Sequence, residues 1–329
     1  MKRTIAALAV AVLGGGAAWG AGAAQPAPTP TPQQLVAAAK RDAGKDFGGT
    51  FLRICVAPES LQPGFGPPPP SAVPDRASWY APPYKVFDDL YFVGTKIHSA
   101  WALKTSGGII IIDTLFDYAV EPEIVQGLVK LGLNPRDIKY VLISHAHGDH
   151  DQGAALLQKR YGAKVVMGAG DWDSTVTRPA TATGGVPRRD IAVGPEGLKL
   201  ALGGTTVDVI LTPGHTPGTL SYIFPVKDHG RTLKVVYSGG TAFNFAPSAQ
   251  AFAIYEASQK KLGQAAKDAG ASVVMSNHTE FDGAYDKARL AQLPRAAGEP
   301  HPYEVGASGV QRYFTMTAAC AEAQRQSLK

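Results

Sequence analysis

Short apolar runs separated by glycine, proline and polar residues fill the sequence from Lys85 onward. Ile109–Ile112 shows no alternation of apolar and polar positions, so we expect a strand there that is buried on both faces. Similar runs predict further strands, bounded by turn residues, at 90–94, 98–104, 108–112, 140–143, 164–167, 198–202, 206–211, 220–224, 233–237 and 272–275. Helical spacing predicts helices at 121–131, from 152 to about 160, near 171, at 255–269 and at about 309–326. Two strand-rich blocks, each closed by helices, predict an α/β fold (αββα sandwich) with two facing mixed sheets and helices on the outer faces.

The first residues follow a different pattern. Lys2 and Arg3 precede a short apolar run, and the small residues of 21–24 offer cleavage sites, so we expect a signal peptide over 1–24 and export to the periplasm. We expect an N-terminal extension over 25–84, with a loose leader at 25–34 and a Pro-rich connector at 61–74. Regular structure is expected to begin near Lys85, with one catalytic domain over 85–329.

Composition narrows the classes of partner. The 329 residues are 45% hydrophobic and 18% charged, as in ordinary globular proteins, and the formal net charge of +5 is scattered along the chain. No basic stripe suits a nucleic acid. The N-terminal apolar run is too short for a permanent membrane anchor. We expect a monomer that acts on a small-molecule substrate.

Two cysteines remain after the leader, Cys55 and Cys320. Exported proteins tend to pair their cysteines, so a bridge between the two is one alternative. The other is two separately buried thiols, because sequence does not set the distance between them.

Histidines and an aspartate crowd the turn after the strand expected at 140–143. His145 and His147 alternate along an extended segment and point the same way, while Asp149 and His150 lie one step further on. Imidazole nitrogens and carboxylate oxygens are the ligands that zinc prefers. A solvated polar loop is the alternative interpretation.

Two more histidines follow strands. His215 lies in a turn made rigid by Pro and Gly residues at 213–218, and His278 follows the strand expected at 272–275. We therefore expect two zinc ions, each with three protein ligands and a position open to water, as in catalytic sites. The two ligand sets are His145, His147 and His215, and Asp149, His150 and His278.

The motif His-x-His-x-Asp-His at 145–150, the turn Thr-Pro-Gly-His-Thr-Pro-Gly at 212–218 and the late His278 are similar to the metallo-β-lactamase superfamily. The likeness covers roughly 85–328 and implies the metallo-β-lactamase fold. Within the superfamily the chain most resembles the third (B-three) subclass of metallo-β-lactamases, because 211–222 is alike and the late ligand is a histidine. Glyoxalase-type and many lactonase-type members have a bridging Asp in a Gly-Asp-Thr stretch, whereas this chain reads Ser-Gly-Gly-Thr at 238–241.

The chain also departs from the subclass. Members hold the drug's carboxylate with a serine-containing stretch near 239–242, where this chain offers only Ser238 and Thr241 as hydroxyls. Cys320 resembles the second cysteine of a pair common in the subclass, but 270–272 contains no first cysteine.

The resemblance implies a metallo-hydrolase that opens a cyclic amide with a zinc-bound hydroxide, and hence a role in antibiotic resistance. Asp149 would orient the nucleophile while it binds the metal. Two further hypotheses are a di-zinc hydrolase of another lactone, ester or amide, and a non-catalytic zinc-binding module. Asp113 either supports the metal loop or caps a turn. Residues given no ligand role are Asp171, Asp173, His98, His229, His301 and Phe243 to Phe245.

Overall fold

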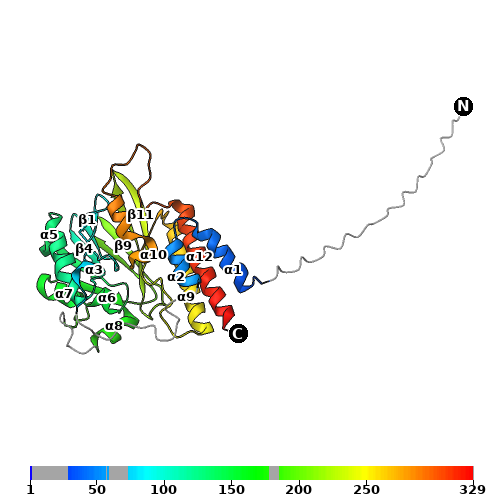
Figure 1. Ribbon diagram of the computed structural model, residues 1–329, viewed down its shortest axis with the longest axis horizontal. Helices are drawn as coiled ribbons and strands as arrows, with labels where there is room; N and C mark the ends of the chain where they lie inside the picture. The colour runs from blue at the N-terminus through cyan, green and yellow to red at the C-terminus, as the bar shows by residue number, and fades with distance from the viewer. Residues whose placement is uncertain (2–28, 57, 59–72, 178–184, 329) are drawn as a thin grey trace. The chain divides into compact units, whose positions relative to one another are not determined.

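The computed structural model describes residues 1, 29–56, 58, 73–177 and 185–328 (Figure 1). The chain divides into two units, Met1–Pro30 and Thr31–Lys329, and the second contains the helices and strands of the fold. The expected signal peptide apart from Met1, most of the Pro-rich connector and residues 178–184 lie outside the described residues. Within the described residues no helix is long and apolar enough to span a membrane.

The first sheet has seven strands in sequence order. The first four pair antiparallel and the last four pair parallel, with helices in the parallel crossovers. Its strands are β1 (Tyr84–Lys85), β2 (Leu90–Phe92), β3 (Trp101–Thr105), β4 (Gly108–Ile112), β5 (Ile138–Leu142), β6 (Lys164–Gly168) and β7 (Ile191–Val193). The crossover elements are α4 (Asp117–Ala119), the π-helix η2 (Val120–Val125), α5 (Gln126–Lys130), the 3-10 helix η3 (Pro135–Asp137), α6 (Gly148–Asp151), α7 (Ala154–Tyr161) and α8 (Ala169–Val176). As predicted, Ile109–Ile112 is buried throughout.

The second sheet has five strands in the order β12-β11-β10-β9-β8. Only β11 and β12 are parallel, since the long helix α9 (Ala249–Asp268) joins them. The strands are β8 (Leu198–Leu202), β9 (Thr205–Leu211), β10 (Leu220–Asp228), β11 (Arg231–Ser238) and β12 (Val273–Ser276). After β12 come α10 (Thr279–Asp282), α11 (Ala284–Leu290) and α12 (Gly306–Ser327).

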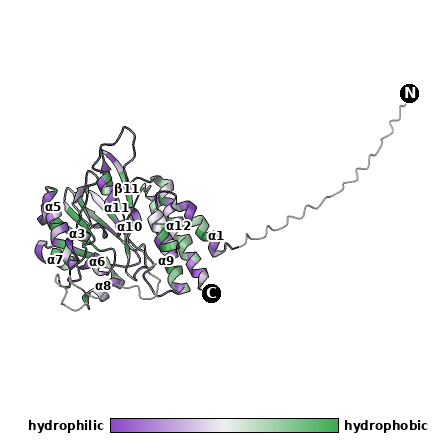
Figure 2. Cartoon of the chain, in the orientation of Figure 1, coloured by the Kyte–Doolittle hydropathy of each residue, from purple (hydrophilic) through white to green (hydrophobic). Residues whose placement is uncertain are grey.

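The two sheets face each other across one apolar core, to which Ile110 and Ile112 contribute from the first sheet and Tyr222 and Phe224 from the second. A second cluster lies between the first sheet and its helices, and a third between the second sheet and α9 and α12. Figure 2 shows hydrophilic and hydrophobic residues mixed along the outer helices, as one buried and one solvated face require. The structure thus confirms the predicted sandwich.

Regular structure begins at Pro32 rather than near Lys85, which corrects the predicted leader and start of order. The helix α1 (Pro32–Ala43) starts with a capping box between Thr31 and Gln34 and with proline in its first turn. These residues look like loop composition, but they are also good helix starters. Both α1 and α2 (Gly48–Cys55) pack on α12, so the N-terminal and C-terminal helices lie side by side (Figure 1).

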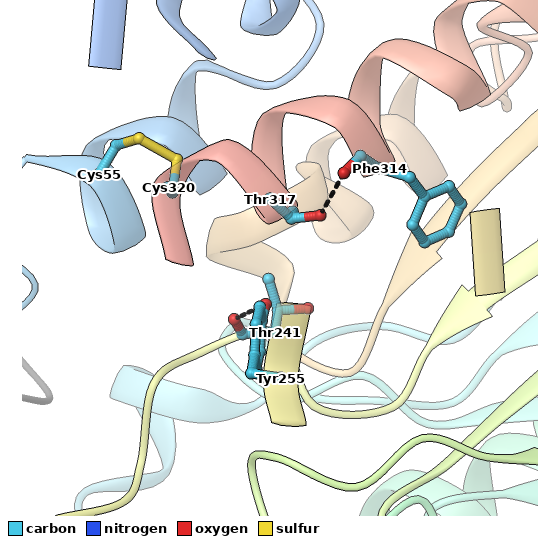
Figure 3. The surroundings of a disulfide bond; sticks show 6 residues. All are labelled: Cys55, Thr241, Tyr255, Phe314, Thr317 and Cys320. Carbon is cyan, nitrogen blue, oxygen red and sulfur yellow. Dashed lines mark hydrogen bonds between the residues drawn. A yellow bond between two sulfur atoms is a disulfide. The ribbon is translucent and has the colours of Figure 1, made fainter. Parts of the chain in front are cut away.

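Cys55 of α2 and Cys320 of α12 form a disulfide, with 4.8 Å between their Cα atoms (Figure 3). Other differences from the predicted elements are local. β3 begins at Trp101 instead of residue 98, α9 begins at Ala249 after the Ser248 cap instead of residue 255, and β7 lies where no strand was predicted. The short elements α3 (Arg76–Trp79), β1, α10 and α11 were not predicted, because segments of two to seven residues show too little periodicity.

Candidate metal centre

Loops from both sheets meet at the predicted histidines. The turn after β5 carries His145 and His147 and leads into α6, which contains Asp149 and His150. The loop between β9 and β10 carries His215, and His278 lies between β12 and α10. Gly214, just before His215, has φ +147°, and a Cβ there would lie 2.9 Å from the Tyr255 Cα, so this turn needs glycine.

The first predicted set comes together. His215 Nε2 lies 3.1 Å from His145 Nε2 and 3.2 Å from His147 Nδ1. Two atoms that each lie about 2.1 Å from one zinc ion at a tetrahedral angle are roughly 3.4 Å apart. The spacing therefore suits three ligands of one cation.

Hydrogen bonds at the Nδ1 atoms of His145 and His215 fix the tautomers of these two rings. His145 Nδ1 lies 2.8 Å from the carbonyl oxygen of Gly239, and His215 Nδ1 lies 2.7 Å from that of Ala242. A carbonyl only accepts, so each Nδ1 carries the proton and each Nε2 presents a lone pair. Two lone pairs that face each other at 3.1 Å repel unless a cation lies between them, so the donor set fits zinc.

Burial keeps these imidazoles neutral. It lowers the pKa of His215 to about 3, assisted by the neighbouring His147. Burial and the adjacent His215 hold the pKa of His145 well below its usual value. Neutral imidazole is the form that binds metal.

The second predicted set also comes together, around one carboxylate oxygen. Asp149 Oδ2 lies 3.1 Å from His150 Nε2 and 3.2 Å from His278 Nε2, and those two nitrogens are 3.1 Å apart. Burial by itself would raise the pKa of Asp149 and lower the pKa of His150, which disfavours the charged form of each. Even so, His150 and His278 hold the pKa of Asp149 well below its usual value, while Asp149 and Asp113 raise the pKa of His150 to about 10. This set therefore contains charge, unlike the first, and a metal ion that binds His150 Nε2 would displace a proton from that ring.

His98, which has no ligand role in the sequence prediction, lies beside the second set. Its Nε2 is 3.6 Å from Asp149 Oδ2, and His98, Asp149 and His278 together form a group able to hold a metal ion. The sequence prediction placed His98 at the start of a strand, whereas the structure places it in the connection between β2 and β3. The remaining two histidines lie elsewhere: His229 is exposed, and His301 stacks on Phe87.

Asp113 lies beneath the metal loop and is fully buried. Its carboxylate accepts hydrogen bonds from the Ser144 backbone N–H at 2.7 Å, the Ser144 hydroxyl at 2.9 Å and the Tyr237 hydroxyl at 2.8 Å. Its Oδ2 also lies 3.2 Å from His150 Nδ1. The geometry favours loop support over simple turn capping.

Asp171 is buried, although it lies in the first turn of α8. Its carboxylate accepts from the backbone N–H of Ala146 at 2.9 Å and of Gly218 at 2.7 Å, and from the Thr216 hydroxyl at 2.7 Å. It thereby joins the loop of His145 and His147 to that of His215. Asp173, in contrast, is exposed and pairs with Arg189.

Ser238 and Thr241 are buried in a hydroxyl network. Thr241 Oγ1 lies 2.9 Å from Ser276 Oγ and 3.3 Å from Tyr313 Oη. Its backbone oxygen accepts a hydrogen bond from the Tyr255 hydroxyl, as Figure 3 shows. These contacts engage the Thr241 hydroxyl inside the protein. Phe243 packs in the core behind the site, while Asn244 is exposed.

Comparison with known proteins agrees with this geometry. Residues 93–232 match the model of the Metallo-beta-lactamase superfamily. The hydroxyacylglutathione hydrolase of Acidiphilium cryptum is 34% identical over 214 residues, which cover 61% of this chain and 78% of that protein. The chain belongs to the metallo-beta-lactamase superfamily. It is therefore a metallo-hydrolase, from a superfamily of zinc-dependent enzymes.

Solved structures of superfamily members narrow the likeness. The subclass B3 metallo-beta-lactamase BJP-1 of Bradyrhizobium japonicum is 28% identical, with a TM-score of 0.60 over 76% of this chain and 95% of that one. Native FEZ-1 metallo-beta-lactamase from Legionella gormanii is 25% identical, with a TM-score of 0.63 over 76% of this chain and 98% of that one. The predicted resemblance to the B-three subclass is confirmed.

Proposed function

We propose that this metallo-hydrolase binds two zinc ions and opens a cyclic amide, as a β-lactamase of the B-three type. The two ligand sets support two ions. The likeness to BJP-1 and FEZ-1 over three quarters of the chain supports a lactam substrate.

The chain's own residues divide the work. His145, His147 and His215 would hold one ion, and Asp149, His150 and His278 the other. Zinc bound in such sites lowers the pKa of a coordinated water toward about 7 and polarises a carbonyl oxygen. Asp149, the one carboxylate among the predicted ligands, orients the water that attacks the lactam carbonyl. The amide C–N bond then breaks, the nitrogen takes up a proton, and a carboxylate forms without a covalent enzyme intermediate.

The residues at 238–241 distinguish a lactam-hydrolysing member of the superfamily from a glyoxalase-type member. Glyoxalase-type members have a bridging Asp in this stretch, whereas this chain has Gly239 and Gly240. A Cβ on Gly240 would lie 2.5 Å from the His215 Cβ, and one on Gly239 would lie 1.7 Å from the Leu220 carbonyl oxygen. Real Cβ atoms do not approach so closely, so a carboxylate at either position would require the backbone or His215 to move.

A second candidate is hydrolysis of a thioester, lactone or other ester. The relative from Acidiphilium cryptum favours it, because that protein is named a hydroxyacylglutathione hydrolase. The same ligand sets would serve this chemistry, since the attack is again on a carbonyl carbon.

A substrate panel on the purified, zinc-loaded protein tests the proposal. We expect turnover of the lactam nitrocefin, its loss with a chelator and its return with zinc. A glutathione thioester and a simple lactone should be hydrolysed much more slowly. The variant His215→Ala is the matched control for contaminating activity. Thioester or lactone turnover without lactam turnover would select the second candidate, and two bound zinc ions without any turnover would select a binding module.

We also propose that the protein is exported to the periplasm. The disulfide between Cys55 and Cys320 supports this, because such bonds persist in oxidising compartments. The intact mass of protein from the periplasmic fraction tests it: loss of residues 1–24 is expected, and full-length protein confined to the cytoplasm would contradict it.

A further inference from the structure

The segment that carries His98 is fastened to the segment that carries His278. The Ser99 backbone N–H donates to the Asn277 carbonyl at 2.9 Å, and the Thr279 N–H donates to the Ile97 carbonyl at 2.8 Å. His98 and His278 form an isolated antiparallel bridge between these donors. The two histidines are therefore neighbours by backbone pairing, and not through mobile side chains.

The turn itself fixes His98. The Thr95 hydroxyl oxygen accepts from the His98 backbone N–H at 2.8 Å, and the Thr95 N–H donates to the His98 carbonyl at 2.8 Å. The imidazole packs edge-on to the Phe116 ring, with 5.3 Å between centroids. His98 is thus held in place with its Nε2 directed toward Asp149.

The distance between His98 Nε2 and Asp149 Oδ2 shows whether His98 is a hydrogen-bond partner of Asp149 or a ligand of the same metal ion. His98 Nε2 and Asp149 Oδ2 are 3.6 Å apart, which is too long for a hydrogen bond between them. It is close to the roughly 3.4 Å expected for two atoms that bind one zinc ion at a tetrahedral angle. The three atoms from His98, Asp149 and His278 all lie within 4.8 Å of one another.

We propose that His98 is a fourth protein ligand of the second ion, together with Asp149, His150 and His278. A fourth ligand takes the position that a three-ligand set leaves to solvent. Exchangeable water is then confined to the side of His145, His147 and His215, and the second ion is retained more firmly. This inference rests on the proposal of two zinc ions, but not on the identity of the substrate.

Metal retention tests the inference without reference to turnover. We expect the full mature chain to bind two zinc equivalents, and His98→Gln and His98→Ala to hold the second at least about 10-fold more weakly, with the first unchanged. His229→Asn is the matched control, because it removes an exposed histidine at a residue whose φ of 48° asparagine tolerates. Retention of the first equivalent shows that a variant is folded.

Cobalt substitution provides a direct count of ligands. Each imidazole bound to Co²⁺ gives a strongly shifted ring N–H signal, so both His98 variants should lack one signal present in the wild type and in His229→Asn. The same number of signals with unchanged retention would overturn the inference. A wild-type protein that binds a single equivalent would instead contradict the proposal of two ions, so the two failures are distinguishable.

Discussion

The two ligand sets differ in what lies behind them. In the first, His145 and His215 direct their Nδ1 atoms at neutral backbone carbonyls. In the second, Asp149 is itself a predicted ligand, and His150 Nδ1 faces a further carboxylate, that of Asp113. Both sets have the spacing of zinc ligands, yet only the second concentrates negative charge.

This contrast assigns different work to the two sides. An ion surrounded by neutral imidazoles keeps its full charge and polarises a carbonyl strongly, whereas nearby carboxylates neutralise an ion and retain it. We therefore expect the first set to dominate activation and the second to dominate retention. Single substitutions in the two sets should therefore lower turnover and zinc retention by different amounts. They are given below from the largest expected loss of turnover to the smallest.

Asp149→Ala removes the carboxylate at the centre of the second set. We expect kcat/KM to fall by more than about 100-fold, the upper end for residues that only support ligands. Zinc content should fall from two equivalents to one, measured by elemental analysis beside the turnover assay. An unchanged content would mean that the second ion is not held by this carboxylate.

Asp171→Ala removes the carboxylate that links the loop of His145 and His147 to the loop of His215. We expect kcat/KM to fall by about 10- to 100-fold, because three donors lose their common acceptor and the imidazoles lose their alignment. Asp173→Ala, two residues away and exposed, is the control and should retain wild-type turnover. Equal losses in the two variants would show that α8 as a whole, not the Asp171 carboxylate, is responsible.

Asp113→Asn keeps the shape of the side chain and removes the charge behind His150. We expect about 10-fold weaker retention of the second ion in chelator competition, with a smaller loss of turnover. A loss of the first ion instead would contradict the division of charge between the sets.

Glu123 is a buried carboxyl group outside the metal centre, and it accepts fewer hydrogen bonds than Asp113 or Asp171. It is fully buried, yet among the described residues only the Ala81 backbone N–H donates to it, and burial raises its pKa to about 8. A raised pKa means that the folded state binds more protons than the unfolded state between about pH 4.5 and 8. The free energy of unfolding should therefore fall as pH rises through this window, with a limiting slope of about 1.4 kcal/mol per pH unit.

Glu123→Gln should remove that fall and leave turnover unchanged, because the amide is neutral at every pH. Urea unfolding at pH 5 and pH 8 measures the difference between the variant and the wild type. Parallel curves for the two proteins would show that Glu123 is not the source of the pH dependence.

Much of this molecule could be predicted from sequence. The run Ile109–Ile112 predicted a doubly buried strand. Six ligand candidates at strand ends predicted two sets, and the structure brings every member of each set within about 3.2 Å of another member. His98 was missed because its turn lacks a dense motif, and its role depends on pairing with a segment 180 residues away in sequence. Asp171 was missed for the same reason, since its three donors come from loops distant in the chain.

The helices α1 and α2 were missed for a different reason. Their short amphipathic pattern follows a Pro- and Thr-rich stretch, and their burial depends on α12 at the other end of the chain. Periodicity reports local preference, whereas this docking is a long-range event.

The bond between Cys55 and Cys320 encloses almost the whole catalytic fold, because the two cysteines are 265 residues apart in sequence. A single proteolytic cut anywhere between them leaves both pieces joined through sulfur. The enzyme can thus be nicked in a surface loop and still remain one covalent molecule, which only reduction would separate.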